Sequence, residues 1–345
     1  MPTALATLSP IPSREFWFRE GDVVLSCPGP NGQPFLYRIH KFMLARHSPH
    51  FADMFKAEGP FEQPLETYEG LPVVPLAEPA VEVFKLLCCL YNAMNGAAFK
   101  DDQRPIARYD WLLRMCDKYK IAPLREVIFA QLKIEWPDTL SGWDAREAQI
   151  AVLGKQHLAA RPSGRVHNMY LDDRLPEPVA TIGIARANGL LQLLPAAFYD
   201  LARRDPRADW DAFHGITTRN LPANQRMLAE GMRSARWNTL GAQDLLALAA
   251  AKERQLQCLR ELLGRISNTP LLHPPCTAAQ DKLVDSIQET AILTRDPLFA
   301  LQRARKHLDA AGICHSCMAR TIYALTALRM CYWRAIPKIY LLERS

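Results

Sequence analysis

Apolar and polar positions alternate along two short segments near the start of the chain. Residues 23–27 and residues 35–39 each alternate with the two-residue period of a half-buried β-strand. Asn31-Gly32 lies between the two segments, and this dipeptide readily takes the positive φ angles that a tight hairpin needs. The pattern therefore predicts two antiparallel neighbouring strands joined by a short turn.

The apolar spacing changes to a helical period after these strands. Phe42, Met43 and Leu44 begin a short helical segment, and Ser48-Pro49 is typical of the start of the next helix. Phe51, Met54 and Phe55 then follow at helical spacing. Further along, the pattern predicts a short strand at residues 73–76 and helical stripes at residues 79–91, 111–119 and 124–132.

Several of these residues together resemble the BTB/POZ family. The segments Asp22-Val-Val-Leu25, Tyr37-Arg38-Ile39-His40-Lys41 and Ser48-Pro49-x-Phe51-x-x-Met54-Phe55 follow one another as in the first half of such a domain. Asp117-Lys118-Tyr119 is similar to the A-D-K-Y helix of the family. The resemblance covers residues 16–137 and is greatest to the BTB proteins abundant in mushroom-forming fungi. It implies a short β-sheet capped by helices and a function in protein–protein interaction.

The apolar patterns and the family resemblance together divide the chain into four parts. We expect a disordered, proline-containing arm at 1–15, an α+β BTB/POZ domain at 16–137, a helical extension and linker at 138–175, and a mainly α-helical region at 176–345. The linker expectation rests on the basic, turn-rich stretch 155–173. In the helical region, Glu177-Pro178 and Asn188-Gly189 predict the start and end of one helix.

Composition and charge make the chain an ordinary globular protein. It has 345 residues, of which 49% are hydrophobic and 23% charged, and its net charge is only +6. No stretch approaches the ~18 consecutive apolar residues of a membrane helix, so no membrane association is expected. The nine cysteines accompany no export signal, which favours free thiols or a metal site over disulfides. We therefore expect a cytosolic or nuclear location.

Two spaced pairs near the C-terminal end are candidate metal ligands. His273-x-x-Cys276 and Cys314-x-x-Cys317 each present two ligands from one turn, and two such turns can complete a tetrahedral site. The closed set of four would make the bound zinc structural. Buried thiols without metal are the commoner explanation of such cysteines, and this alternative stays open. The remaining cysteines are expected in the core: Cys27, Cys88, Cys89, Cys116, Cys258 and Cys331.

The family resemblance also suggests partner-binding residues. Asp22 and Arg38 correspond to the charged pair that lines the dimer groove of BTB transcription regulators, and His40 follows at the step from strand to helix. The alternative for the first two is a structural ion pair across the hairpin. For His40, the alternative is a hydrogen-bonded structural histidine.

The resemblance implies a homodimer or an adaptor that binds cullin-3. Adaptor-type members place a hydrophobic-x-Glu element in the loop that corresponds to residues 56–70, and no glutamate there has a large apolar residue two positions earlier. Leu76-Ala-Glu78 fits the spacing but lies beyond the predicted strand. The resemblance thus implies cullin-3 as a possible partner, but its docking motif is not found in this loop.

The sequence carries none of the common catalytic motifs, so we expect no enzyme activity. The competing hypothesis is a zinc-stabilised, nucleic-acid-associated regulator that uses the basic C-terminal helices. Basic residues from Arg303 onward alternate there with Tyr323, Tyr332, Trp333 and Tyr340. Because such charges are more often the solvated face of a helix, nucleic acid is not the expected partner.

Overall fold

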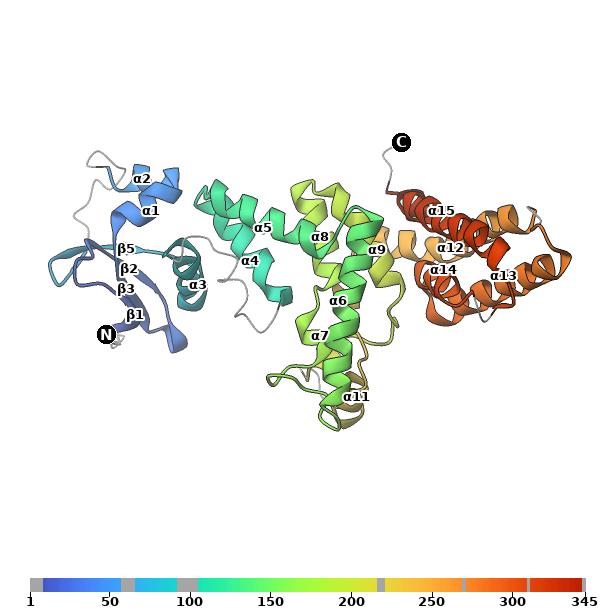
Figure 1. The fold of residues 1–345 in the computed structure, drawn as a ribbon. Helices are drawn as coiled ribbons and strands as arrows, with labels where there is room; N and C mark the ends of the chain where they lie inside the picture. Colours follow the sequence, from blue (N-terminus) through green and yellow to red (C-terminus); the bar gives the residue numbers. More distant parts are fainter. Residues whose placement is uncertain are drawn as a thin grey trace. The chain divides into compact units, whose positions relative to one another are not determined.

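The computed structural model describes residues 9–56, 66–91, 105–215, 221–268, 271–308 and 311–342. The chain forms two compact units, residues 1–132 and residues 133–345. The first contains all the named strands, and the second is helical (Figure 1). The expected α+β part followed by a mainly helical part is confirmed at this level.

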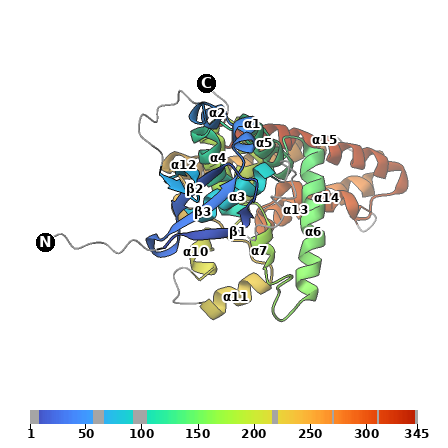
Figure 2. The same ribbon diagram turned by 90° about the vertical axis from the view of Figure 1, so that its left-hand side faces the viewer.

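A five-stranded mixed sheet forms the centre of the first unit, in the order β1-β3-β2-β5-β4. β2 and β3 pair antiparallel around Asn31 and Gly32, whose φ angles of 58° and 75° confirm the predicted hairpin. β1 runs parallel to β3, and β5 runs parallel to β2. The strands β1, β2 and β3 lie side by side in both ribbon views (Figure 1, Figure 2). Their bounds are β1 Ile11–Trp17, β2 Val23–Pro28, β3 Pro34–Ile39, β4 Thr67–Tyr68 and β5 Leu71–Pro75.

The first strand corrects the expected N-terminal arm. We placed residues 1–15 in a disordered arm because of the prolines, but β1 begins at Ile11 and Pro12 lies within it. A proline is compatible with this position because β1 is the last strand on its side of the sheet, where one backbone edge needs no partner. Residues 1–8 lie outside the described part of the chain.

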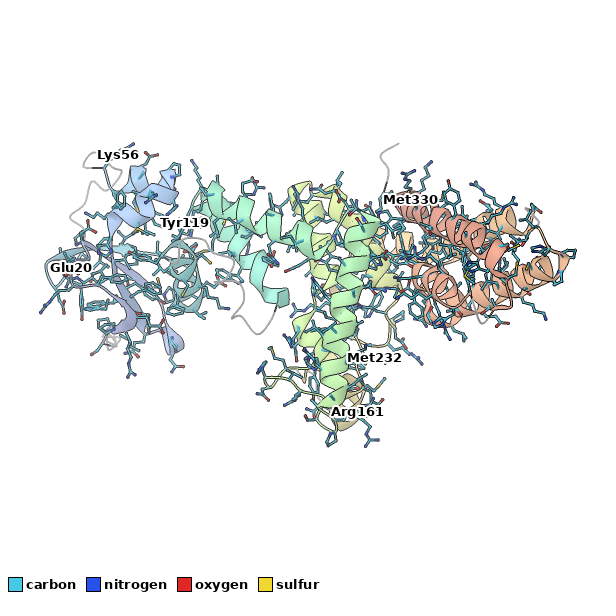
Figure 3. The ribbon with its side chains drawn as sticks, viewed as in Figure 1. Glu20, Lys56, Tyr119, Arg161, Met232 and Met330 are labelled. Carbon is cyan, nitrogen blue, oxygen red and sulfur yellow. The ribbon has the colours of Figure 1, made fainter. Side chains whose placement is uncertain are left out.

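Ser48 connects the short helices of the first unit to a later one. Its hydroxyl accepts a hydrogen bond from the Phe51 N–H (3.1 Å) at the start of α2 and donates one to the Tyr119 carbonyl. The ring of Tyr119, labelled in Figure 3, stacks on Phe51 with centroids 4.7 Å apart. The predicted Ser-Pro helix start is thus confirmed. The helices of this unit are α1 Lys41–His47, α2 Pro49–Met54, α3 Ala80–Tyr91, α4 Pro105–Lys118 and α5 Ala122–Glu135.

The second unit begins with a group of helices of unequal length. The predicted helix after Glu177 is confirmed: the Glu177 carboxylate accepts hydrogen bonds from the first N–H groups of α8, and Gly189 ends that helix with a φ of 67°. α8 packs against α9. These helices are α6 Leu140–Ala159, α7 Leu171–Arg174, α8 Pro178–Asn188, α9 Leu194–Ala202, α10 Trp210–Phe213 and α11 Leu221–Ala229.

The stretch expected to be a linker is instead packed into the second unit. α6 continues to Ala159, and His157 is buried with its Nδ1 2.9 Å from the Gly164 carbonyl. Asp172 is also buried and accepts a hydrogen bond from the Ser234 N–H (3.1 Å). The basic, turn-rich composition reflects this compact turn between α6 and α7, so residues 155–173 are not a linker.

Four further helices complete the described part of the second unit: α12 Ala242–Ser267, α13 Pro274–Thr294, α14 Pro297–Lys306 and α15 His315–Ile339. α12 packs on α13, α13 on α14, α14 on α15, and α15 back on α12, which closes a four-helix arrangement. Because short connections join successive helices, the starts of α13 and α15 lie at the same end. Among the described helices, none combines the length and the apolar content needed to cross a membrane.

Candidate metal centre

The two predicted ligand pairs meet at one end of the four-helix arrangement. His273 immediately precedes α13, whose first residues are Pro274 and Pro275, and Cys276 follows in the first turn. Cys314 immediately precedes α15, and Cys317 lies in its first turn. Each pair is therefore positioned by a helix start, where the backbone conformation is fixed by the helix that follows.

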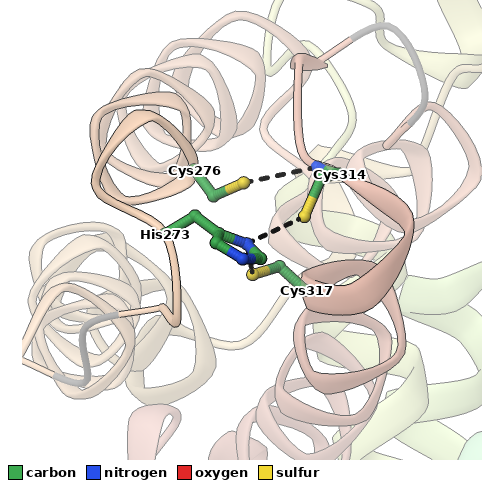
Figure 4. A group of neighbouring side chains, drawn as sticks. All are labelled: His273, Cys276, Cys314 and Cys317. Carbon is green, nitrogen blue, oxygen red and sulfur yellow. Dashed lines mark hydrogen bonds between the residues drawn. The ribbon is translucent and has the colours of Figure 1, made fainter.

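The ligand atoms of these four residues lie within 4.8 Å of one another (Figure 4). His273 Nδ1 is 3.2 Å from Cys314 Sγ and 3.5 Å from Cys317 Sγ. The Cys314 N–H donates to Cys276 Sγ at 3.4 Å. The two distances from His273 Nδ1 to the sulfurs are close to those between ligand atoms in tetrahedral sites, which are about 3.5–3.8 Å for bonds of about 2.0–2.3 Å.

The environment also favours a thiolate in the cluster. The Cys317 N–H, together with hydrogen bonding from the Cys276 and Cys317 thiols and His273, lowers the pKa of Cys314 to about 6. Since a thiolate is the form that binds metal, this lowered pKa favours the metal-binding form of Cys314. Cys276 and Cys317 are buried, whereas Cys314 is half-buried and His273 is exposed. The set of one nitrogen and three sulfurs can hold a metal ion.

A turn before Cys314 lets the two pairs approach. Gly312 takes a φ of 77°, a conformation that favours glycine, and its backbone lies close to Ala279 of α13. The chain then enters α15 through Ile313 and Cys314. The turn that precedes α15 thus uses the backbone freedom of Gly312.

The cysteines expected in the core divide into two groups. Cys27, Cys89 and Cys116 are buried, and burial raises the pKa of each thiol to about 12. The other three are half-buried rather than fully enclosed: Cys88, Cys258 and Cys331.

The predicted partner-binding residues make internal contacts in the first unit. The expected ion pair between Asp22 and Arg38 is not formed. Asp22 instead accepts a hydrogen bond from the Lys41 N–H (2.7 Å), whereas Arg38 donates to the Gly21 carbonyl (3.2 Å). The register explains the difference, because Arg38 lies opposite Val24 rather than opposite Asp22.

His40 occupies the expected step between β3 and α1. Its Nδ1 lies 3.2 Å from the Tyr91 hydroxyl, and its backbone N–H donates to the same oxygen at 3.0 Å. Its ring packs against Phe18, with centroids 5.1 Å apart. These contacts correspond to the structural alternative that we considered for this histidine.

Glu78 of the Leu76-Ala-Glu78 match is also held within the first unit. Its carboxylate accepts hydrogen bonds from the Tyr119 hydroxyl (2.6 Å) and from Lys118, and Leu76 is buried. Most of the loop in which the docking element was sought, residues 57–65, lies outside the described residues, as do residues 92–104, which follow the helical stripe at residues 79–91.

Burial separates the aromatic and basic residues of the C-terminal helices. Tyr332, Trp333 and Tyr340 are buried and therefore offer no surface for stacking on bases, whereas Tyr323 is exposed. Arg329 is buried and forms an ion pair with Asp144 of α6. The exposed basic side chains of this region are Arg303, Lys306, Arg320, Arg334 and Lys338.

A buried ionic network in the second unit was missed by our sequence reasoning. Asp200 of α9 is fully buried and pairs with Arg203, Arg204 and Arg233 at 2.7–2.9 Å. Burial alone would raise the pKa of Asp200, but these guanidinium groups and Arg146 hold it well below its usual range. The sequence signal for this network was Asp200 within an apolar helix face, followed by Arg203 and Arg204 three and four positions later.

Comparisons of this chain with family models, curated proteins and solved structures gave no match. The BTB/POZ resemblance therefore rests on the residues of the first unit, and the metal centre rests on its geometry.

Proposed function

We propose that this chain is a non-catalytic protein-interaction protein with two parts. A BTB-type domain docks protein partners, and the helical unit is stabilised by a structural zinc ion. The observation that carries the first part is the succession of the β2–β3 hairpin, the His40 step and the Ser48 cap, in the order seen in the BTB sequence pattern. The second part is supported by the close approach of the His273/Cys276 and Cys314/Cys317 pairs.

Asp22, Arg38 and His40 make hydrogen bonds within the first unit, so we look for the partner surface among exposed side chains nearby. Phe42, in the first turn of α1, exposes 67% of its surface next to the His40 step. A large aromatic side chain in this position is well suited to anchor a partner. We therefore place the docking surface around α1.

Affinity purification of the full chain from its native cells tests this placement. Phe42→Asp is expected to remove a partner recovered in stoichiometric amount. Val152→Asp is the matched control, because Val152 is similarly exposed (57%) but lies on α6 of the second unit. Retention of every partner by Phe42→Asp, or equal losses from both variants, would contradict the proposal.

Two specific associations follow from the BTB proposal and can be tested separately. A pulldown with purified cullin-3 tests the adaptor role. Light scattering of the purified full chain tests whether one or two copies are present. If the chain neither binds cullin-3 nor dimerises, and Phe42→Asp loses no partner, the proposed interaction role is wrong.

For the second part of the proposal, zinc is the metal that fits best. Three cysteines and one histidine are a common ligand set of structural zinc sites, and a closed set of four leaves no open position for catalysis. The ion would join the start of α13 to the start of α15. Metal analysis of the purified chain should give one zinc per chain, which is lost in Cys314→Ser.

Cys331→Ser is the matched control for this measurement. Cys331 is a half-buried cysteine of the same helix, α15, but it lies outside the cluster. This variant should retain its zinc. Substoichiometric zinc in the unaltered chain, or the same zinc content in both variants, would refute the structural zinc site.

A further inference from the structure

A groove of about 500 Å³ lies between α13 and α14 of the second unit. Its α13 wall consists of residues at successive helical turns, from Ala279 to Thr290. At 1.5 Å per residue this wall is about 16 Å long. The length matches about three turns of a helix and exceeds that of a simple inorganic anion.

The floor of this groove is apolar and made partly of small residues. Leu283 and Ile287 come from α13, and Ala300 and Ala304 come from α14. All four are buried to 9% exposure or less. Because Ala300 and Ala304 have small side chains, the backbone of a docked segment can approach α14 closely. The floor can therefore accept a ridge of apolar side chains from that segment.

The rim of the groove is basic on both sides. Lys282 lines it from α13, and Arg303 and His307 line it from the end of α14. All three side chains belong to exposed residues, and no carboxylate is among the described residues that line the groove. Ser286 and Thr290 add hydroxyl groups. The polar side chains that line the groove are therefore cationic or neutral.

We propose that the groove between α13 and α14 docks an acidic amphipathic helix of a partner protein. The apolar ridge of that helix would lie on the floor, and its flanking carboxylates would face Lys282 and Arg303. Charge complementarity and the length of the α13 wall select this occupant. The inference concerns a different surface from the one around α1 and requires neither the BTB assignment nor zinc.

The test uses the full chain and a defined probe. A fluorescein-labelled helical peptide of about 14 residues carries leucine and alanine at i, i+3, i+4 and i+7, with glutamate on both flanks. Fluorescence anisotropy should show saturable binding that weakens as salt is raised. The combined variant Lys282→Glu/Arg303→Glu should bind at least about tenfold more weakly, because attraction at both walls becomes repulsion.

The matched control is Lys252→Glu/Arg260→Glu, which makes the same charge change at two exposed residues of α12 outside the groove. This control should bind the peptide within about twofold of the unaltered chain. A peptide with lysine in place of glutamate should not bind. Circular dichroism of each variant establishes that the helices are retained.

Three outcomes would overturn the proposal. The first is the absence of peptide binding at low salt. The second is equal weakening by both double variants, which would indicate attraction by net charge alone. The third is equally tight binding of a short DNA duplex or of inorganic phosphate that depends on Lys282 and Arg303, which would make the groove a general anion site.

Discussion

His214 lies between two carboxylates in the second unit, and its protonation should contribute to stability. Its Nε2 is 3.2 Å from Asp172, and its Nδ1 is 3.1 Å from Asp173, both of α7. Its ring stacks on Trp210, with centroids 3.7 Å apart. Burial alone would lower the pKa of His214, but the hydrogen bonds and charges of the two aspartates raise it to about 9.

The size of the effect follows from the difference in pKa between the folded and unfolded chains. An unfolded histidine has a pKa of about 6.5, and each unit of difference corresponds to about 1.4 kcal/mol. With 13% of its side-chain surface exposed, solvent screening reduces the contribution to about 2 kcal/mol. Because the folded pKa is the higher one, this stabilisation is fully present below about pH 6.5 and is lost as the pH rises through about 9.

Comparison of the unaltered chain with His214→Gln isolates this contribution. Urea unfolding at about pH 6 should show the variant less stable by about 2 kcal/mol, and the difference should shrink to below about 1 kcal/mol near pH 10. Histidine NMR measures the pKa directly. A stability difference that does not change with pH, or a His214 resonance that titrates near pH 6.5, would refute the reasoning.

Three further predictions concern other parts of the chain. Asp200→Asn should lower the free energy of unfolding by about 3–5 kcal/mol in urea titration, because buried arginines lose their shared carboxylate. The control Asp205→Asn removes a surface ion pair with Arg207 and should lower it by less than about 1 kcal/mol. Equal losses of stability in the two variants would contradict this prediction. Ser48→Ala should cost about 1–2 kcal/mol in the same assay because α2 loses its cap, and an unchanged midpoint would contradict it. A chelator should lower the thermal midpoint of the unaltered chain but not that of Cys314→Ser, and equal shifts would exclude a stabilising metal.

Local sequence signals predicted those elements whose stabilising contacts are close in the chain. Asn31-Gly32 determines the hairpin through its own positive φ angles, and Ser48 caps the helix that begins at the next residue by accepting a hydrogen bond from the Phe51 N–H. Glu177 and Gly189 similarly mark the start and end of α8. In each case the residue type restricts the backbone where it occurs, so the prediction needs no knowledge of distant segments.

Contacts between distant segments account for the predictions that were wrong. β1 is a strand because Ile11 and Pro12 lie beside Phe35 and Leu36 of β3, and neither the prolines nor the local pattern contains that information. The burial of Asp172 depends on Ser234, which is far away in the sequence. Composition could therefore suggest an arm and a linker, although both segments are stabilised by tertiary contacts.

The metal centre depends both on local sequence signals and on contacts between distant segments. The x-x spacing of each pair is local, and the prolines after His273 fix a helix start, so two ligands per turn could be predicted. The meeting of the two turns requires that α13 and α15 begin at the same end of the helices, which depends on the packing of α12 to α15. A bound ion would join the two ends of a segment of about 40 residues, and closing so long a loop in the unfolded chain costs conformational entropy. The packing of α12 to α15, which brings the two turns together, is therefore also what would make the metal stabilising.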